Sequence, residues 1–248
     1  MQVLFSGQVP KDHAFPDSIE DAFELAPGRI AVSDGASESF DSKTWANLLT
    51  ARFVEQPGLG ASWLATVIEG YAGHYDVPNL SWSKEAAYER GSFATLLGIE
   101  ERLEHRSIDV LGIGDSLAVL LDGGVFVASF PYVHSQEFQQ RPELLSTKPT
   151  QNEFVTAPDF FLKHHRTWSI EGIRAPLVLC MTDALAEWAL RNTEEGRPVW
   201  ELLADIEKLP DFDELVLRER QAKTMRIDDA TLVRVSFAKL RSDELPEP

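Results

Sequence analysis

The sequence predicts an α+β fold built on antiparallel sheets, and three observations carry that prediction. Apolar runs rich in Val, Leu, Ile and Phe recur along the chain at strand length. The longest, residues 107–129, carries Asp122-Gly123-Gly124 between two apolar halves, which is typical of a β-hairpin and therefore of antiparallel pairing. Segments with helical spacing occur without the regular alternation of a parallel α/β sheet. We therefore expect helices in layers outside antiparallel sheets.

The expected strands are apolar runs bounded by turn residues. They are residues 2–9, 22–33, 93–101, 107–129, 175–183 and 230–237. The expected helices, whose apolar residues recur at helical spacing, are residues 42–55, 60–75, 183–192, 198–208 and about 211–222. Ser42 is the expected N-cap of the first helix. Residues 132–174 are polar and interrupted by proline, so we expect loops with short helices along one edge of the core.

Length, charge and cysteine content limit the class of protein. With 248 residues, 44% of them hydrophobic, we expect one domain over residues 1–240 and a polar tail over 241–248. The net charge of −17 would repel nucleic acid and anionic lipid, so neither is an expected partner. Cys180 is the only cysteine, which excludes an intramolecular disulfide. Neither a signal peptide nor an apolar stretch of about 20 residues is found, so we expect a soluble, cytoplasmic protein.

Acidic residues lie at the boundaries of the apolar strands. Three of these residues follow a strand, namely Asp34, Asp115 and Asp183, and four precede one, namely Glu20, Asp21, Asp228 and Asp229. Strand ends of a compact domain can meet at one rim, where clustered carboxylates would repel one another unless a cation lay between them. Hard ions such as Mg²⁺ and Mn²⁺ prefer oxygen ligands of this kind. The pattern therefore favours a carboxylate-rich metal site.

Each acidic group also has a purely structural explanation. These explanations are a solvated helix face capped by Ser18 for Glu20 and Asp21, an Asx turn at Asp115, a helix cap at Asp183, and an exposed turn at Asp228 and Asp229. Each is the more common situation for a single residue. Together they would all have to fall by accident on apolar strand boundaries, which favours the metal site.

Six blocks of the sequence occur in an order found in a known family. The blocks are IEDAF, VSDGA, GSFATLLG, GIGDSLAVLLDGG, CMTDAL and DDATLVRV. Over about residues 1–238 the chain resembles the metal-dependent, type 2C serine/threonine protein phosphatases, in which they appear as Glu-Asp, Asp-Gly, Gly-Ser-Thr-Ala, Gly-Asp-Ser, Ser-Asp-Gly and Asp-Asn-x-Thr. The resemblance implies a four-layer α-β-β-α sandwich of two antiparallel sheets flanked by helices. It also implies a centre of two Mn²⁺ or Mg²⁺ ions at one rim.

The resemblance also assigns roles to individual residues. Asp34 would bridge the two ions and act, with Glu20 and Asp21, in catalysis. The other ligands would be the Gly35 carbonyl, Asp183 and Asp228, with Asp115 at a third, weaker metal site. Glu20 would act mainly through metal-bound water. The implied reaction is hydrolysis of phosphoserine or phosphothreonine in a phosphorylated protein by a metal-bridging hydroxide, in opposition to a serine/threonine kinase.

The sequence departs from the family pattern around the phosphate. The family's phosphate-binding arginine position is Pro16 here, and Lys11 and His13 are the nearby basic residues. No glycine follows Asp183, and Asp229 stands where asparagine is usual. Two alternatives to an active phosphatase therefore remain. One is a catalytically weak or inactive relative that acts as a binding or regulatory module, and the other is an unrelated acidic α+β domain.

Overall fold

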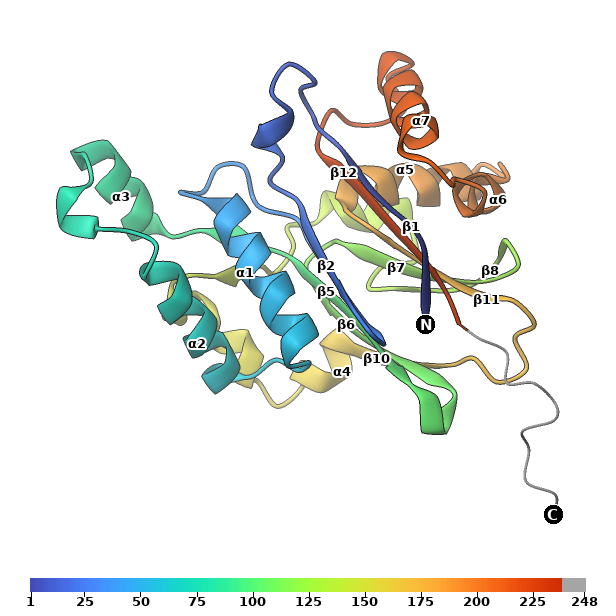
Figure 1. Cartoon of the computed structure of the whole chain (residues 1–248), viewed down its shortest axis with the longest axis horizontal. Helices are drawn as coiled ribbons and strands as arrows, with labels where there is room; N and C mark the ends of the chain where they lie inside the picture. The colour runs from blue at the N-terminus through green and yellow to red at the C-terminus, as the bar shows by residue number, and fades with distance from the viewer. Residues whose placement is uncertain (238–248) are drawn as a thin grey trace.

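Apolar strands from distant parts of the chain pair into two antiparallel sheets in the computed structural model, which describes residues 1–237 (Figure 1). The first sheet contains, in order, β1 (Gln2–Val9), β12 (Ala230–Ser236), β11 (Pro176–Met181), β7 (Leu117–Asp122) and β8 (Val125–Phe130). The second contains β10 (His165–Ser169), β6 (Ser107–Ile113), β5 (Leu96–Arg102), β3 (Arg29–Ser33) and β2 (Ala22–Ala26). A separate short pair joins β4 (Phe93–Ala94) to β9 (Leu145–Ser146). The predicted class is confirmed.

The predicted hairpin joins β7 to β8. Asp122 pairs with Val125, and the two glycines between them have φ values of 58° and 93°. Glycine adopts these left-handed conformations without the steric penalty that a Cβ atom would add. The DGG sequence therefore determines both the turn and the antiparallel direction of the pair.

An apolar core fills the space between the two sheets. It includes Ile30, Ile99 and Val110 from the second sheet and Val178 and Val233 from the first. Strands buried on both faces read as nearly continuous apolar runs, which is why these segments were recognisable from sequence. Cys180 lies in the same core, and burial raises the pKa of its thiol to about 12.

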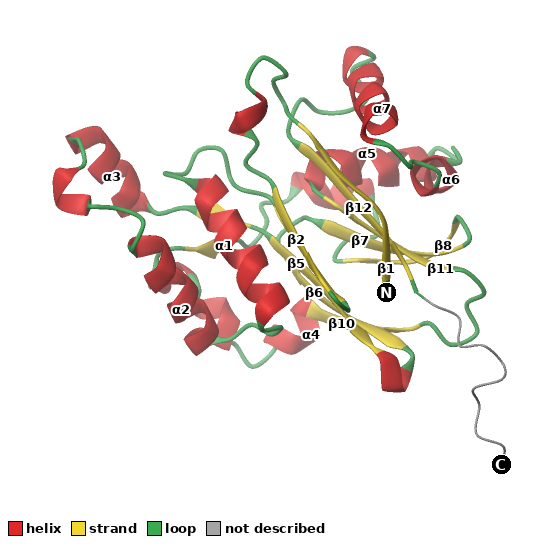
Figure 2. Cartoon of the chain, in the orientation of Figure 1, coloured by secondary structure: helices red, strands yellow, loops and turns green. Residues whose placement is uncertain are grey.

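Helices cover the outer face of each sheet, as the red ribbons on either side of the yellow strands show (Figure 2). The second sheet is covered by α1 (Ser42–Glu55) and α2 (Ala61–Ala72). The first is covered by α5 (Asp183–Glu194), α6 (Val199–Ala204) and α7 (Leu209–Gln221). Large side chains such as Trp45, Trp188 and Phe212 form two further cores between helices and sheets. This arrangement confirms the predicted α-β-β-α sandwich.

Residues 132–174 differ from expectation. They include β9 and the edge strand β10, which pairs with β6 along its whole length, besides the helix α4 (Phe160–His164) and several short 3-10 helices. Only Trp168 of β10 is buried, so the strand has no visible apolar alternation. The helix α3 (Trp82–Arg90) was missed for a similar reason, because it buries no residue and carries no apolar stripe.

The cap of α1 is also different. Asp41, not Ser42, is the N-cap, and its carboxylate accepts a hydrogen bond from the Thr44 N–H at 3.0 Å. Ser42 is the first residue of the helix and points its hydroxyl elsewhere, as described below.

Two expectations concern the ends of the chain and the membrane. Among residues 1–237, the helices are all too short or too polar to cross a lipid bilayer. The predicted domain of residues 1–240 extends past the described part and stays a prediction, and the predicted tail of residues 241–248 lies outside the described residues.

Candidate metal centre

The strand registers bring the acidic boundaries of both sheets to one rim. In the first sheet, Met181 at the end of β11 pairs with Leu232 near the start of β12 and with Leu117 at the start of β7. In the second sheet, Ser33 at the end of β3 pairs with Ala22 at the start of β2. The acidic residues next to these ends are Glu20, Asp21, Asp34, Asp115, Asp183, Asp228 and Asp229. The registers gather the acidic boundaries within each sheet, and the bonds from Thr182 and Thr231 to Asp21 join the two sheets at this rim.

The ionisation of Asp34 is influenced by several other carboxylates. Burial raises the pKa of Asp34 well above its usual range, and the negative charges of Asp21, Asp183, Asp115 and Asp228 raise it further. These four residues come from four different segments of the chain. The arrangement is costly with every carboxylate ionised, and a bound cation would relieve the repulsion.

The backbone at Asp34 is held by Thr95. The Asp34 N–H donates to Thr95 Oγ1 at 2.8 Å, and the Asp34 carbonyl accepts from the Thr95 N–H at 2.9 Å. The next residue, Gly35, approaches the segment before β2 so closely that a Cβ atom would lie 2.7 Å from the Glu20 carbonyl oxygen. Glycine is therefore required at this position for the Asp34 turn to pack against the Glu20 segment.

Asp21 is buried and hydrogen-bonded. Its Oδ2 accepts from Thr231 Oγ1 at 2.6 Å and from Thr182 Oγ1 at 2.9 Å, so it joins the end of β11 and the start of β12 to the start of β2. Burial raises its pKa in spite of these two donors, and the charges of Asp229 and Asp183 add to the effect. A buried side chain with these partners is not part of a solvated helix face, so that alternative is wrong.

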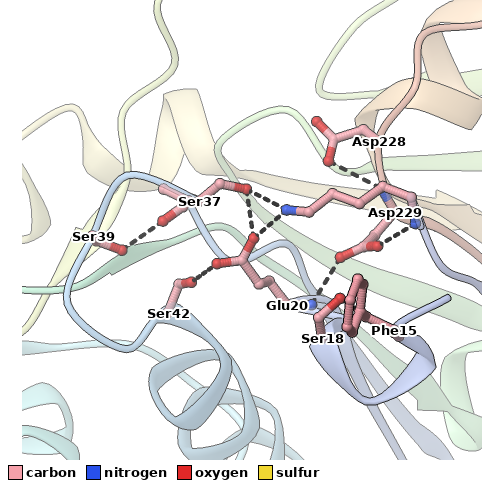
Figure 3. A network of polar contacts seen from close by, with 10 residues as sticks. Phe15, Ser18, Glu20, Ser37, Ser39, Ser42, Asp228 and Asp229 are labelled. Atoms are coloured by element: carbon pink, nitrogen blue, oxygen red, sulfur yellow. Dashed lines mark hydrogen bonds and ion pairs between the residues drawn. The ribbon is translucent and has the colours of Figure 1, made fainter.

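Glu20 is at the centre of a polar network (Figure 3). Its Oε2 accepts from Lys11 Nζ and from Ser37 Oγ, both at 2.5 Å, and its Oε1 accepts from Ser42 Oγ at 2.7 Å. Burial raises the pKa of Glu20, but the three donors and the Lys11 charge outweigh burial and lower it overall. The lowered pKa favours the ionised Glu20 carboxylate, which accepts three hydrogen bonds.

Asp183 is the first residue of α5, but it does not cap the helix. The N-cap is Thr182, and within residues 1–237 no side chain makes a capping hydrogen bond at this end of α5. The Asp183 Oδ2 forms an ion pair with Arg226 Nη2 at 2.5 Å, whereas Oδ1 is buried without a hydrogen-bond partner among the described residues. A buried carboxylate oxygen without a donor is costly, and it is a typical place for a metal ion.

The neighbours Asp228 and Asp229 have different surroundings. Asp229 is buried, and its two oxygens accept from the backbone N–H groups of Lys11 at 2.7 Å and Glu20 at 2.8 Å (Figure 3). Asp228 is half-buried, and burial followed by the charge of Asp183 raises its pKa. The pair is therefore not an exposed turn. Asp228 Oδ1 accepts from the Asp229 N–H at 2.9 Å, and the Asp228 charge helps to raise the pKa of Asp34. Asp229 holds the backbone of two other residues.

Asp115 is buried at the end of β6, and burial with the charge of Asp183 raises its pKa to about 6. This places it in the same electrostatic cluster as the other carboxylates. Its assignment to a third metal site stays a prediction.

The oxygen ligands are of the type that a hard divalent cation prefers, but their side chains are not arranged around one point. In residues 1–237, no group of three or more His, Cys, Asp or Glu side chains is arranged closely enough to hold a metal. Two of the expected ligands instead form ion pairs with basic residues, Glu20 with Lys11 and Asp183 with Arg226. The oxygen-only chemistry, the unpartnered Asp183 oxygen and the repulsion at Asp34 fit Mn²⁺ or Mg²⁺.

Sequence reasoning missed several residues of this rim. Arg226, Ser37 and the buried Arg220, which donates to the Pro10 carbonyl at 2.7 Å, had no motif to mark them. Of the two basic residues it named, Lys11 is in the network, whereas His13 lies 3.6 Å from Asp213 instead.

Comparisons with known proteins give the fold. No protein-family model matches this chain, and no curated protein matches its sequence. A bacterial serine phosphatase superposes with a TM-score of 0.59 at 14% identity, covering 96% of this chain and 99% of that one. The Staphylococcus aureus serine/threonine phosphatase gives 0.57 at 13% identity, covering 96% and 98%. The Mycobacterium tuberculosis serine/threonine phosphatase gives 0.53 at 17% identity, covering 94% and 97%. The chain therefore has the fold of these bacterial serine/threonine phosphatases, as its sequence blocks predict.

Proposed function

We propose that this protein is a metal-dependent phosphatase that hydrolyses phosphoserine and phosphothreonine in proteins, in opposition to a serine/threonine kinase. One observation carries the proposal: at one rim of a fold shared with known phosphatases, the charges of four other carboxylates add to burial in raising the pKa of Asp34. The order of the sequence blocks and the chemistry of the donors agree with it. Cytoplasmic placement follows only from the sequence pattern and is part of the proposal.

The ligand assignment follows the sequence blocks. Asp34, the Gly35 carbonyl, Asp183 and Asp228 would hold the two ions, and Glu20 would act mainly through water. Bound Mn²⁺ or Mg²⁺ would supply Lewis acidity, lowering the pKa of a water molecule and balancing charge on the phosphoryl oxygens. A third, weaker site would involve Asp115.

Other residues of the chain position these ligands. Asp229 fixes the backbone of Glu20, and Asp21 ties that segment to the ends of β11 and β12 through Thr182 and Thr231. Cys180 lies between the sheets with a raised pKa, so its thiol cannot reach a phosphate at the rim as a nucleophile. The protein's own residues therefore position the metal ligands, and water is the expected nucleophile.

A second candidate function is a binding or regulatory module with weak or no activity. The observation in its favour is that Pro16 opens the short 3-10 helix Pro16–Ser18 where the resemblance places a phosphate-binding arginine. The retained carboxylate rim is the observation against it.

Hydrolysis of p-nitrophenyl phosphate and of a phosphothreonine peptide tests the proposal. We expect activity with Mn²⁺, loss in excess EDTA and recovery when Mn²⁺ is restored, with Mn²⁺ binding followed in parallel by calorimetry. Asp34→Asn should be inactive. Glu104→Gln, an exposed change beyond the far end of β5, is the matched control and should behave as the original protein. Mn²⁺ binding without turnover would support the binding module, and full activity in EDTA would exclude the metal mechanism.

A further inference from the structure

Lys11 competes for an oxygen that the proposed metal site needs. Its ammonium group is 2.5 Å from Glu20 Oε2 and also donates to Ser37 Oγ at 2.8 Å. Lys11 and Ser37 both donate to Glu20 Oε2, and Ser42 donates to Oε1, so three donors already share this carboxylate. A cation or its water shell that approaches Glu20 Oε2 competes with the Lys11 ammonium group for that oxygen.

A divalent ion and the Lys11 ammonium group would oppose each other's binding at Glu20. A divalent ion beside Glu20 would repel an ammonium group held at the same oxygen, since both are positive and only a few ångströms could separate them. Binding of the ion therefore weakens the Lys11–Glu20 pair, and the pair weakens binding of the ion by the same free energy. Lys11 is a built-in counter-ion of the metal-free protein.

The displaced ammonium group stays at the rim. The Lys11 N–H donates to the buried Asp229 carboxylate at 2.7 Å, so its backbone is fixed next to the cluster. The charges that now stabilise its ammonium form come from Glu20, Asp229 and Asp228. Metal ions would neutralise much of that field. Lys11 would then be a partly exposed cation, near the metals, without an anionic partner.

We propose that a divalent metal displaces Lys11 from Glu20 and that the released ammonium group then binds the phosphoryl group of the substrate. This inference rests on the proposed function. It gives Lys11 a specific task, to couple metal binding to phosphate binding. A phosphate dianion suits a released ammonium because a charge-assisted hydrogen bond replaces the one lost to Glu20. Lys11 is therefore a substrate-binding residue only in the metal-loaded protein.

The test measures Mn²⁺ and inorganic phosphate binding by calorimetry in the original protein, Lys11→Met, Lys11→Arg and Lys43→Met. Lys43 is the matched control, because among residues 1–237 its ammonium group bonds only the Asp17 carbonyl and pairs with no carboxylate of the cluster. We expect Lys11→Met to bind Mn²⁺ about fivefold more tightly, as fits the loss of one partly exposed competing ion pair. At saturating Mn²⁺ it should bind phosphate about tenfold more weakly, and Lys11→Arg should restore most of that loss.

The outcomes are distinguishable. Phosphate should bind the original protein measurably only when Mn²⁺ is present, and Lys43→Met should match it throughout. If Lys11→Met leaves either the Mn²⁺ or the phosphate affinity unchanged while the original protein binds Mn²⁺ and is active, the inference is wrong and the proposed function stands. If no variant binds Mn²⁺, both are overturned. Melting temperatures of all four proteins check that each is folded.

Discussion

Individual carboxylates of the rim differ in what stabilises their charge. Glu20 and Asp183 each have a basic partner, Lys11 and Arg226, whereas Asp34 forms no ion pair among residues 1–237 and the charges of other carboxylates raise its pKa. Asp229 is satisfied by backbone N–H groups. The effect of removing a charge should therefore depend on the residue, even though all these side chains lie in one cluster.

Asp34→Asn and Asp183→Asn should each lower the rate by orders of magnitude, because each removes charge from the proposed metal centre. Their stabilities in EDTA should differ. Asp34→Asn relieves repulsion without losing a partner, so the free energy of unfolding should rise by on the order of 1 kcal/mol. Asp183→Asn also breaks the Arg226 pair, so little change is expected. Thermal melts beside activity assays check this. Unfolding of Asp183→Asn with normal specific activity of the folded fraction would contradict a metal role.

Asp228→Ala and Asp229→Asn should show which of the two residues is a metal ligand and which one holds the neighbouring backbone. Asp228→Ala should abolish activity and weaken Mn²⁺ binding with little effect on folding. Asp229→Asn replaces one acceptor oxygen with a donor that faces a backbone N–H, so it should destabilise the fold by about 1–3 kcal/mol. Activity of its folded fraction should stay within about tenfold, since the ligands are unchanged. Denaturant unfolding and Mn²⁺ titration measure both. The opposite pattern would assign Asp229 as the ligand.

At the scale of elements, the segment between β3 and α1 connects the site to the helix layer. It begins with Asp34 and Gly35 and ends with the helix cap Asp41. Asp41 accepts from the Thr44 N–H and from the Tyr75 hydroxyl, which fixes α1 against the end of α2. A well-defined start of α1 is needed because Ser42, its first residue, donates to Glu20.

Asp41→Ala should destabilise the protein by about 1–2 kcal/mol through loss of the cap. Burial raises the pKa of Asp41, but bonds from Tyr75 and Thr44 outweigh it and lower the pKa below 3.8. The ionised cap therefore stabilises the fold above about pH 4, and this contribution is lost as the pH falls through the folded-state value. Melting curves from pH 3 to 7 should show the deficit of the variant shrinking in acid. A constant deficit would mean that the charge of Asp41 is unimportant.

At the scale of the whole molecule, the carboxylate rim links pH, metal and stability. Burial and mutual repulsion raise the pKa values of Asp21, Asp34, Asp115 and Asp228. The folded protein therefore holds protons that the unfolded chain has already released. Stability contributed by these groups falls as the pH rises from their ordinary values through the raised ones.

The pKa of Asp115 is about 6 in the folded protein, against an ordinary value of 3.8. In EDTA, Asp115 should therefore lower the melting temperature as the pH rises from about 4 to about 6. Asp115→Asn should remove the decrease that Asp115 causes. The melting temperature of the variant relative to the original protein should therefore rise through this pH range and stay constant above it. Saturating Mn²⁺ should reduce the difference. Melting curves of both proteins, with and without Mn²⁺, measure it. Equal pH profiles would show that Asp115 does not carry the repulsion.

Much of the fold could be predicted because its signals are local. The apolar runs marked most of the strands, the DGG turn marked the β7–β8 hairpin, and helical spacing marked the helices that cover the sheets. The strand β10 and the helix α3 could not be predicted. The strand β10 buries one residue and the helix α3 buries none, so neither has an apolar pattern in its sequence.

The sequence by itself determined which residue types lie at the rim, because acidic residues at strand ends are a property of chain order. Only the tertiary structure decided how each is paired. Asp21 meets Thr182 across 161 positions of sequence, and Arg226 meets Asp183 from a separate segment. Such pairs depend on strand register and side-chain direction across two sheets, which no local pattern encodes. For the same reason, Lys11 was only one of two nearby basic residues until the fold placed its ammonium on Glu20.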